Sequence, residues 1–349
     1  MREQSLLPES DMKYREAGVD LDAAERSVKS LEKLVQSTAD AWTLSEIGSF
    51  GGLYRVPGDV VDPILVSSAD GVGTKIKLAF MTGVHDTIGR DIVNHCVNDI
   101  LVQGARPLFF LDYLGLGKLE EAVVSEVVRG VAEACKENSC ALLGGETAEL
   151  PDLYSPGEYD LAGFIVGIVG EDSLLDGSRI KEGHILVGYA SSGLHTNGYT
   201  LARHIIFEVM GLSHSSELPG LGKTVAEELM TVHQSYLPLL IEPLSHNSIE
   251  GLAHITGGGI PGNLQRVLPQ GLGAVIDRSS WEIPPAFRIL QEGGGVSIEE
   301  MDRVFNMGIG MIAVVEETQT SSLISSAREK GSDAWVIGEI IDGGGIKYR

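Results

Sequence analysis

The chain has 349 residues, 43% of them hydrophobic, which is enough to bury the cores of two domains. It contains 26 Lys and Arg against 49 Asp and Glu residues, so the net charge is −23, and an acidic surface of this kind argues against nucleic acid as a partner because it repels phosphate backbones. No apolar run approaches the ~20 residues of a membrane span, and we expect neither a signal peptide nor membrane contact.

The first half of the chain alternates between strand-like and helix-like segments. Residues 1–16 are polar and are expected to form an arm, and Asp20 is placed to cap a helix whose apolar face carries Val28, Leu31, Leu34 and Val35. After a turn-rich region over 38–62, the predicted elements are a strand at 64–69, a helix at 88–103, a strand at 108–114, a helix at 120–137 and strands at 140–144 and 160–169.

The segment 170–183 is rich in Gly, Asp and Ser and predicts a hinge. The alternation then restarts, with a strand at 184–190, helices at 199–210 and 225–242, and strands at 251–256, 272–277, 308–315 and 334–340. This pattern predicts two α/β domains, residues 1–171 and 172–349. The three cysteines lack metal-ligand spacing, and we expect them to be reduced thiols of a cytoplasmic protein.

Two glycine-rich segments resemble nucleotide-binding motifs without matching them. Residues 217–224 end in Gly-Lys-Thr like a P-loop, but Glu217 stands where the first glycine belongs, and we interpret the segment as a loop leading into a helix. Residues 115–117 read Gly-Leu-Gly, but Glu120 occupies the position of the third glycine in a dinucleotide fingerprint.

The strongest chemical signal is SSADGVGTK at residues 67–75, where a strand ends at Asp70. Gly71 and Gly73 let the backbone approach a ligand, and N–H groups in such a turn can hold phosphate oxygens. Lys75 adds a positive charge, and a carboxylate beside a phosphate requires a cation between them, so Asp70 implies Mg²⁺. A tight surface turn is the alternative explanation for this segment when it is considered alone.

Three further carboxylates occur near strand ends or glycine turns: Asp99 in CVNDIL, Asp112 in the apolar segment FFLDYLG, and Glu146 after Gly144 and Gly145. Each has a structural alternative, as a helix-surface charge, a strand-end charge or a neighbour of a helix cap. Together with Asp70 they indicate a nucleotide site with several metal ions, because charge inside apolar segments is costly unless it is paired or metal-bound.

Two segments of the second half combine a strand, small polar residues and a following helix. SSGLHTNGYT at 191–200 offers Ser191, Ser192, Thr196 and Asn197 near a helix start, which favours anions, and His195 can bind phosphate or transfer protons. Helix capping or packing is the alternative role of His195. HITGGGIPGN at 254–263 repeats the pattern and predicts a second phosphate contact, with a helix-entry loop as the alternative.

These segments together resemble the phosphoribosylformylglycinamidine cyclo-ligase (AIR synthetase) family from about residue 14 to 340. The similar blocks are YREAGVD (14–20), DGVGTK (70–75), HDTIGRD (85–91), CVNDI (96–100), PLFFLDY (107–113), GGETAELP (144–151), SSGLHTNGY (191–199), HITGGG (254–259) and FNMGIGM (305–311). Their order and spacing are more specific than any single block. Arg15, Glu16 and His95 depart from the family pattern, and His95 is interpreted as a solvated or hydrogen-bonded side chain in preference to a metal ligand.

The resemblance implies a ferredoxin-like N-terminal half that forms a barrel in a homodimer, an α/β C-terminal domain, and ATP-dependent closure of the imidazole ring in purine synthesis. It implies ATP and Mg²⁺ as cofactors and leaves a monovalent cation requirement open. The residues expected in the site are Asp70, Lys75 and His195 as catalytic groups; Asp70, Asp99, Asp112 and Glu146 as metal ligands; Gly71, Val72, Gly73, Thr74, Lys75, Asn98, Gly144, Gly145 and Thr147 at ATP; and Ser191, Ser192, His195, Asn197, Thr256, Gly257, Gly258, Gly259 and Asn306 at the substrate.

Two other functions stay open from the sequence. One is a sister enzyme of the same superfamily, of the thiamine-monophosphate kinase or selenophosphate synthetase type, which the blocks at 109–113 and 147–151 disfavour. The other is a non-catalytic nucleotide-binding regulator, which the intact set of carboxylates and Lys75 disfavours. Substrate-dependent release of ADP separates these functions from a cyclo-ligase.

Overall fold

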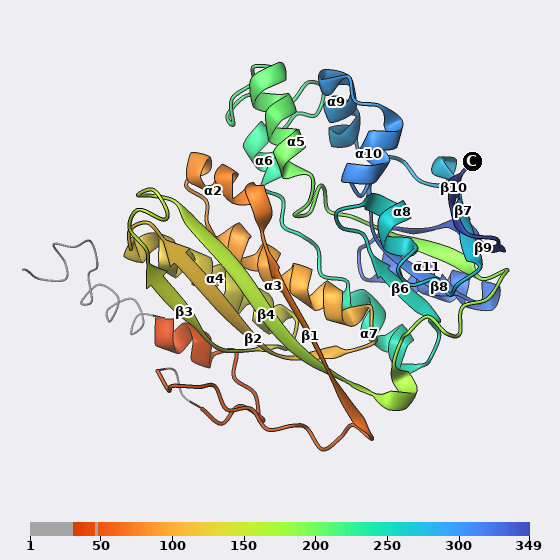
Figure 1. The fold of residues 1–349 in the computed structure, drawn as a ribbon, viewed down its shortest axis with the longest axis horizontal. Helices are drawn as coiled ribbons and strands as arrows, with labels where there is room; N and C mark the ends of the chain where they lie inside the picture. The colour runs from red at the N-terminus through yellow and green to blue at the C-terminus, as the bar shows by residue number, and fades with distance from the viewer. Residues whose placement is uncertain (1–30, 46–47) are drawn as a thin grey trace, which may run out of the picture.

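Two separate β-sheets share the chain, the first built from residues before Gly170 and the second from residues after Ile185 (Figure 1). The computed structural model describes residues 31–45 and 48–349. The predicted polar arm, the Asp20 cap, Arg15 and Glu16 lie outside these residues, and the described part of that helix covers 31–36. The architecture is mixed α/β, as the alternation of segments predicts.

The first half follows the sequence pattern closely. Its elements are β1 (Pro63–Gly71), η2 (Gly73–Lys75), α2 (Ile76–Thr82), α3 (Asp86–Leu101), β2 (Arg106–Leu116), α4 (Glu121–Glu137), β3 (Ala141–Glu149), β4 (Tyr159–Gly170) and η3 (Glu171–Ser173). The predicted strands and helices are confirmed with small shifts of their ends, whereas α2 was not predicted. Gly83, in the left-handed conformation, ends α2 after only two turns.

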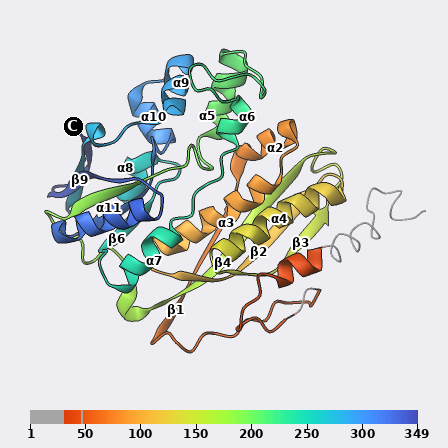
Figure 2. The same cartoon turned by 180° about the vertical axis from the view of Figure 1, so that it is seen from behind.

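The first sheet has the strand order β1-β4-β2-β3, in which only β2 and β3 run parallel. Helices α3 and α4 lie against one face of it, as Figures 1 and 2 show. The other face carries exposed apolar side chains, with Leu65 58% and Phe164 45% exposed. Within the residues that the structure describes, this face of the sheet is an apolar surface without a helical cover.

The second half contains ten helical segments and six strands within residues 185–348. In chain order they are β5 (Ile185–Ala190), α5 (Tyr199–Arg203), the π-helical η4 (His204–Val209), α6 (Val225–Leu229), α7 (Leu237–Ser245), β6 (Gly251–His254), α8 (Gly259–Leu264), β7 (Leu272–Ile276), η5 (Arg278–Ser280), α9 (Pro285–Gly294), α10 (Ile298–Val304), β8 (Ile309–Val315), η6 (Glu317–Gln319), α11 (Thr320–Glu329), β9 (Ala334–Asp342) and β10 (Gly345–Tyr348). The sheet order is β10-β7-β9-β5-β8-β6. All the predicted strands are present, and β10 is an additional one.

The predicted helix over 225–242 is wrong, because α6 ends at Leu229 and α7 begins at Leu237. Residues 231–236 between them contact α3 of the first half. The main chain there is paired by side chains of α3 in place of helical hydrogen bonds: Asp91 accepts from His233 N, and Asn98 accepts from Tyr236 N. Tertiary contacts therefore override the apolar periodicity of this segment.

The P-loop-like segment is a loop that leads into a helix, as interpreted from the sequence. Thr224 caps α6, accepting from Glu227 N while the Glu227 side chain accepts from Thr224 N. Within residues 31–45 and 48–349, no helix has the length and apolar character needed to cross a membrane.

Candidate functional site

The two halves meet along the polar side of α3. Besides the bonds of Asp91 and Asn98 to the main chain of 231–236, Asn94 Nδ2 donates to His233 O at 2.7 Å and Asn98 Nδ2 donates to Gln234 O at 2.9 Å. Asn98 is fully buried in this joint. Asn98 acts as a structural clamp between the domains, and its contact with ATP stays a prediction.

Lys75 lies in the same joint and is fully buried. Its Nζ atom is 2.7 Å from Asp91 Oδ2 and donates to Thr231 O at 2.7 Å. Burial lowers the pKa of Lys75, and the charge of Asp91 opposes that shift. In this structure the ammonium group is held in an ion pair inside the protein, and the contact of Lys75 with phosphate stays a prediction.

An interdomain cleft of about 440 Å³ opens beside this joint, between β1 and α3 on one side and β6 and α8 on the other. Its polar lining consists of Ser67, Ser68, Asp70, His95, Asp99, Gln103, His254, Thr256, Asn263 and Arg266. We call it the interdomain cleft. It collects residues from both halves of the sequence, which is common for ligand sites in two-domain proteins.

Histidines from three elements form a continuous network at the back of the cleft. His95 Nε2 is 2.7 Å from Asp70 Oδ2 and 3.7 Å from Asp99 Oδ2, and its Nδ1 is 2.8 Å from Thr196 Oγ1. His254 Nδ1 lies 2.8 Å from Asp99 Oδ1, and its Nε2 lies 3.1 Å from His233 Nε2. The predicted ligands Asp70 and Asp99 are thus brought to one cleft, with the His95 ring between them and the His254 ring on the far side of Asp99.

The electrostatics of this network differ from ring to ring. Burial lowers the pKa of His95, but its bond to Asp70 and the charge of Asp99 outweigh burial and raise that pKa overall. Burial raises the pKa of Asp70 and of Asp99, yet contact with His95 and His254 respectively leaves both pKa values below the ordinary range. The two carboxylates therefore stay ionised and can hold a cation.

His195 lies behind the network, away from the lining of the cleft. It is 1% exposed, stacks on His233 with 4.0 Å between ring centroids, and accepts from Ser192 N at 3.3 Å. Burial, followed by the charges of His254 and Lys75, lowers its pKa well below the ordinary range. The structure places His195 against His233 and Ser192, and its contact with phosphate stays a prediction.

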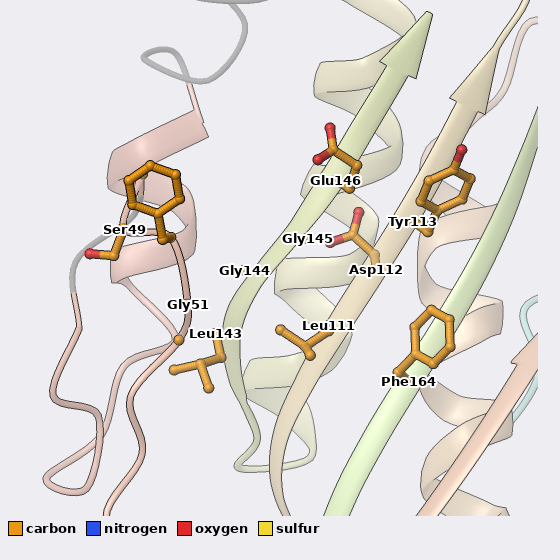
Figure 3. A pocket seen from close by; sticks show the side chains of 13 residues that line it. Ser49, Gly51, Leu111, Asp112, Tyr113, Leu143, Gly144, Gly145, Glu146 and Phe164 are labelled. Carbon is orange, nitrogen blue, oxygen red and sulfur yellow. The ribbon is translucent and has the colours of Figure 1, made fainter. Parts of the chain in front are cut away.

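A second hollow of about 480 Å³, the sheet pocket, lies at β2 and β3 beside residues 48–52 (Figure 3). Its lining includes Asp112, Glu146, Gly144 and Gly145. Among residues 31–45 and 48–349, no Lys, Arg or His forms an ion pair with either carboxylate. Burial raises the pKa of Asp112 to about 7.

The two pairs of predicted metal ligands occupy different sites. Asp70 is in register with Gly163 of β4, which is in register with Asp112 of β2, and Asp112 is in register with Gly145 of β3. Two strand spacings of ~4.8 Å separate Asp70 from Asp112. Gly145 makes room for the carboxyl group, since a Cβ atom there would lie 2.2 Å from Asp112 Oδ1. Thr147 continues β3 beyond the pocket lining.

The glycine turn after Asp70 packs against the second domain. Gly71 N donates to Asp70 Oδ1, Val72 is buried, and Thr74 Oγ1 is 2.8 Å from Thr200 Oγ1. Gly73 and Thr74 line a third hollow together with Thr196, Asn197 and Gly198. The turn is therefore part of the domain joint, and its open side faces the 196–200 loop.

The predicted substrate residues of the second half form two supported loops. Ser191 Oγ donates to Asn306 Oδ1, Asn306 Nδ2 donates to Gly193 O, and Ser192 Oγ donates to Val232 O. Gly258 and Gly259, both with positive φ, lead into α8, and Thr256 lines the interdomain cleft. Gly259 has no room for a side chain, because a Cβ atom there would overlap Asp302 O.

Several residues of the site were missed from the sequence. Asn263 is buried and donates through Nδ2 to Gly259 O at 2.8 Å, which holds the glycine loop. Arg266, three residues later on the same side of that helix end, brings a cation to a cleft otherwise rich in carboxylates. The i, i+3 spacing of Asn263 and Arg266, which places both on one side of a helix, could have identified them from the sequence. No sequence signal pointed to His233, because its role depends on the break in the helix that was predicted over 225–242.

Comparison with known proteins matches both halves of the chain. The model described as "AIR synthase related protein, N-terminal domain" matches residues 52–169, and its C-terminal counterpart matches residues 181–349. A phosphoribosylformylglycinamidine cyclo-ligase of Sorangium cellulosum is 50% identical over 338 residues, covering 96% of this chain and 97% of that relative. The corresponding protein of Citrifermentans bemidjiense is 50% identical over 335 residues, covering 96% of each.

Solved structures share the fold at much lower identity. Thiamine-monophosphate kinase from Stenotrophomonas maltophilia K279a has a TM-score of 0.67 at 18% identity, covering 91% of this chain and 95% of that one. Hydrogenase maturation protein HypE in complex with ATP has a TM-score of 0.68 at 17% identity, covering 94% and 89%. These likenesses concern the fold alone.

Proposed function

The chain belongs to the phosphoribosylformylglycinamidine cyclo-ligase family, and from this membership we infer the reaction that its cleft performs. The protein is an ATP-dependent carbon–nitrogen ligase of purine biosynthesis. It converts formylglycinamidine ribonucleotide and ATP into aminoimidazole ribonucleotide, ADP and phosphate. Identity of 50% along nearly the whole length of the relatives carries this conclusion.

We propose that the substrate lies in the interdomain cleft and that Arg266 holds its phosphate. Arg266 is the cation of that lining, and guanidinium groups bind phosphate through paired N–H donors. Thr256 and the backbone of Gly257, Gly258 and Gly259 stand beside it, supported by Asn263. The loops carrying Ser191, Ser192, Asn197 and Asn306 form the rest of the proposed substrate side.

We propose that ATP binds along the edge of the first sheet, between the sheet pocket and Asp70. Asp112 and Glu146 offer only oxygen atoms and form no ion pair among the described residues, and this donor set fits Mg²⁺. Bound there, the ion would neutralise negative charge on the phosphates. Gly144 and Gly145 leave backbone space for the nucleotide, and Asp70 and Asp99 remain proposed ligands of a second ion.

The chemistry follows from the poor reactivity of a formamide. Its carbonyl carbon is a weak electrophile and its oxygen a poor leaving group. We propose that the formyl oxygen attacks the γ-phosphorus of ATP, which releases ADP and forms an imino-phosphate. The amidine nitrogen then attacks the formyl carbon, the C–O bond breaks, and phosphate leaves as the ring closes. Holding both reacting groups in one cleft supplies the proximity that this step needs.

Isotope labelling tests this route. ADP release that depends on formylglycinamidine ribonucleotide separates a cyclo-ligase from a kinase of the same fold or a nucleotide-binding regulator. Substrate carrying ¹⁸O in its formyl group should transfer the label to inorganic phosphate. Label found only in water would show that ATP drives a different step, and the proposed route would be abandoned.

We further propose that the protein is a cytoplasmic homodimer in which ferredoxin-like N-terminal halves, residues 1–171, join into a barrel. The uncovered apolar face of the first sheet supports this arrangement, since such a face is stabilised by burial against a partner. The three cysteines are free and buried thiols, which accords with a reducing compartment. The C-terminal domain is proposed to span 172–349.

A further inference from the structure

In the interdomain cleft, donor atoms of His95, Asp99 and His254 lie within 4.8 Å of one another, and Asp70 Oδ2 lies 2.7 Å from His95 Nε2. We propose that these four side chains bind a divalent transition metal ion such as Zn²⁺ or Co²⁺ in preference to Mg²⁺. The inference shares with the proposed function only the use of Asp70 and Asp99 as metal ligands. The proposed function does not include the identity of this metal or the role of His95 and His254 as its ligands.

Main-chain partners fix the orientation of the Asn98 side-chain amide. Its Oδ1 accepts from Tyr236 N at 2.9 Å and its Nδ2 donates to Gln234 O at 2.9 Å, so both ends of the amide are assigned by main-chain partners. The same Nδ2 lies 3.2 Å from His233 Nε2. A donor at this distance requires an acceptor, and His233 Nε2 must therefore carry a lone pair.

The lone pair of His233 then decides the state of His254. His254 Nε2 lies 3.1 Å from His233 Nε2, so His254 must carry its proton on Nε2 to donate there. A neutral imidazole holds one proton, which leaves a lone pair on His254 Nδ1. That lone pair lies 2.8 Å from Asp99 Oδ1, a carboxylate oxygen. Two acceptors at this distance repel each other unless a cation lies between them.

A metal ion satisfies this position better than a second proton. The His254 ring is buried beside the rings of His95 and His233, so a second proton would place a charge where water cannot solvate it. Donor atoms of His95, Asp99 and His254 all lie within 4.8 Å of one another. Two ligands at ~2.0–2.1 Å from a tetrahedral ion are about 3.3 Å apart, so small side-chain rotations convert these contacts into a coordination shell.

The chemistry of the donors selects the metal. Imidazole suits Zn²⁺, Co²⁺ and related ions, whereas Mg²⁺ prefers oxygen ligands and keeps its waters. Thr196 Oγ1 contacts His95 Nδ1 at 2.8 Å and His233 Nδ1 at 3.2 Å, and His233 contacts His254. These outer partners orient both imidazoles, as is usual for metal-binding histidines.

Metal titration without nucleotide tests the inference. The full-length protein, first treated with a chelator, is titrated with CoCl₂ and with ZnCl₂ in the presence of excess MgCl₂, followed by the visible absorption of bound Co²⁺ and by calorimetry. One tight site per chain is expected. His95→Gln and His254→Gln should each weaken it by more than the ~10–100-fold typical of losing an outer-shell partner. His246→Gln, at an exposed histidine outside the cleft, should bind as the wild type does.

Three outcomes overturn the inference: no site in the presence of MgCl₂, equal binding by His95→Gln and His246→Gln, or displacement of Co²⁺ by equimolar Mg²⁺. Circular dichroism confirms that each variant is folded, and His95→Gln alone decides if His254→Gln does not fold. ADP release is measured separately. Substrate-dependent ADP release without a Co²⁺ site refutes only the metal inference, and a Co²⁺ site without that release refutes only the proposed function.

Discussion

The Nζ atom of Lys75 lies 2.7 Å from Oδ2 of Asp91, and neither side chain is exposed to solvent. Lys75 closes the turn after β1, Asp91 belongs to α3, and the same ammonium group donates to Thr231 O in the second domain. Burial lowers the pKa of Lys75 and raises that of Asp91, so each charge depends on the other for compensation. The pair therefore acts on folding and on the domain joint.

Removing one partner of this ion pair should lower the free energy of unfolding substantially. Lys75→Met leaves Asp91 buried without a counter-charge, and the free energy of unfolding should fall by about 3–5 kcal/mol. The measurement is urea unfolding followed by circular dichroism. Lys77→Met is the matched control, since Lys77 forms an exposed ion pair with Glu158 and its loss should cost less than ~1 kcal/mol.

A double variant separates charge from packing at the same place. Asp91→Asn keeps an oxygen that accepts from His233 N, so Lys75→Met combined with Asp91→Asn removes both charges and retains that bond. Most of the lost stability should return. A loss as large in the double variant as in Lys75→Met would mean that the lysine stabilises through packing alone.

Asp70→Asn should remove catalysis and keep the fold. The amide still offers an oxygen near His95 Nε2, but it lacks the charge that a metal ion requires. Turnover should fall by at least ~100-fold at saturating Mg²⁺, with an unchanged circular dichroism spectrum. Activity near that of the wild type would remove Asp70 from the list of metal ligands.

Asp112 should make stability depend on pH in an unusual direction. Its pKa is raised from 3.8 to about 7 in the folded protein, so the folded state holds this proton more tightly than the unfolded state does. The associated stability is complete below about pH 4 and is lost as the pH rises toward 7. Asp112→Asn, which stays neutral, should be more stable than the wild type at about pH 8, with a ceiling of ~4 kcal/mol.

The comparison is made by urea unfolding in EDTA at about pH 4.5 and about pH 8, so that metal binding does not compensate the charge. The advantage of Asp112→Asn should be largest at the higher pH and small at the lower one. Mg²⁺ should then stabilise the wild type more than the variant. An advantage of equal size at both pH values would contradict the raised pKa.

The proposed dimer should depend on the uncovered face of the first sheet. Leu65→Asp places a charge on that face, where the side chain is 58% exposed in the single chain, and should shift the sedimenting species from dimer to monomer. Val336→Asp is the matched control on a strand of the second sheet, 45% exposed. A monomeric wild type with full activity, or equal behaviour of both variants, would refute the proposal.

Much of the fold could be predicted because apolar periodicity and turn residues act locally. Strands such as β1 and β4 and helices such as α3 and α4 agree with their predicted ranges to within a few residues. The helix over 225–242 failed for a non-local reason: the apolar spacing is helical, but Asp91, Asn94 and Asn98 pair the main chain at 233–236. No window of sequence contains both sides of that interaction.

The site was predicted in part for the same reason. Asp70 and Asp99 were recognisable from strand ends and neighbouring motifs, and the fold brings them to one cleft. Lys75 was also recognisable from its place beside a glycine turn. The local sequence is the same, however, whether such a lysine faces phosphate or a buried aspartate. His233 could not be found, since it sits in a segment whose structure depends on the opposite domain.

In the clamp between α3 and residues 231–236, side chains of α3 form four hydrogen bonds with main-chain atoms of the segment, and Asn98 also contacts the His233 ring. Residues of α3 in this clamp should therefore tolerate substitution less well than residues of the 231–236 segment. Asp91, Asn94 and Asn98 must keep their chemistry, whereas the partner segment can vary wherever only its peptide groups are read, with proline excluded at 233 and 236 because their N–H groups are donors. Sequence change at such positions would leave the relative placement of the two domains unchanged, whereas His233 and Tyr236 are also held through their side chains.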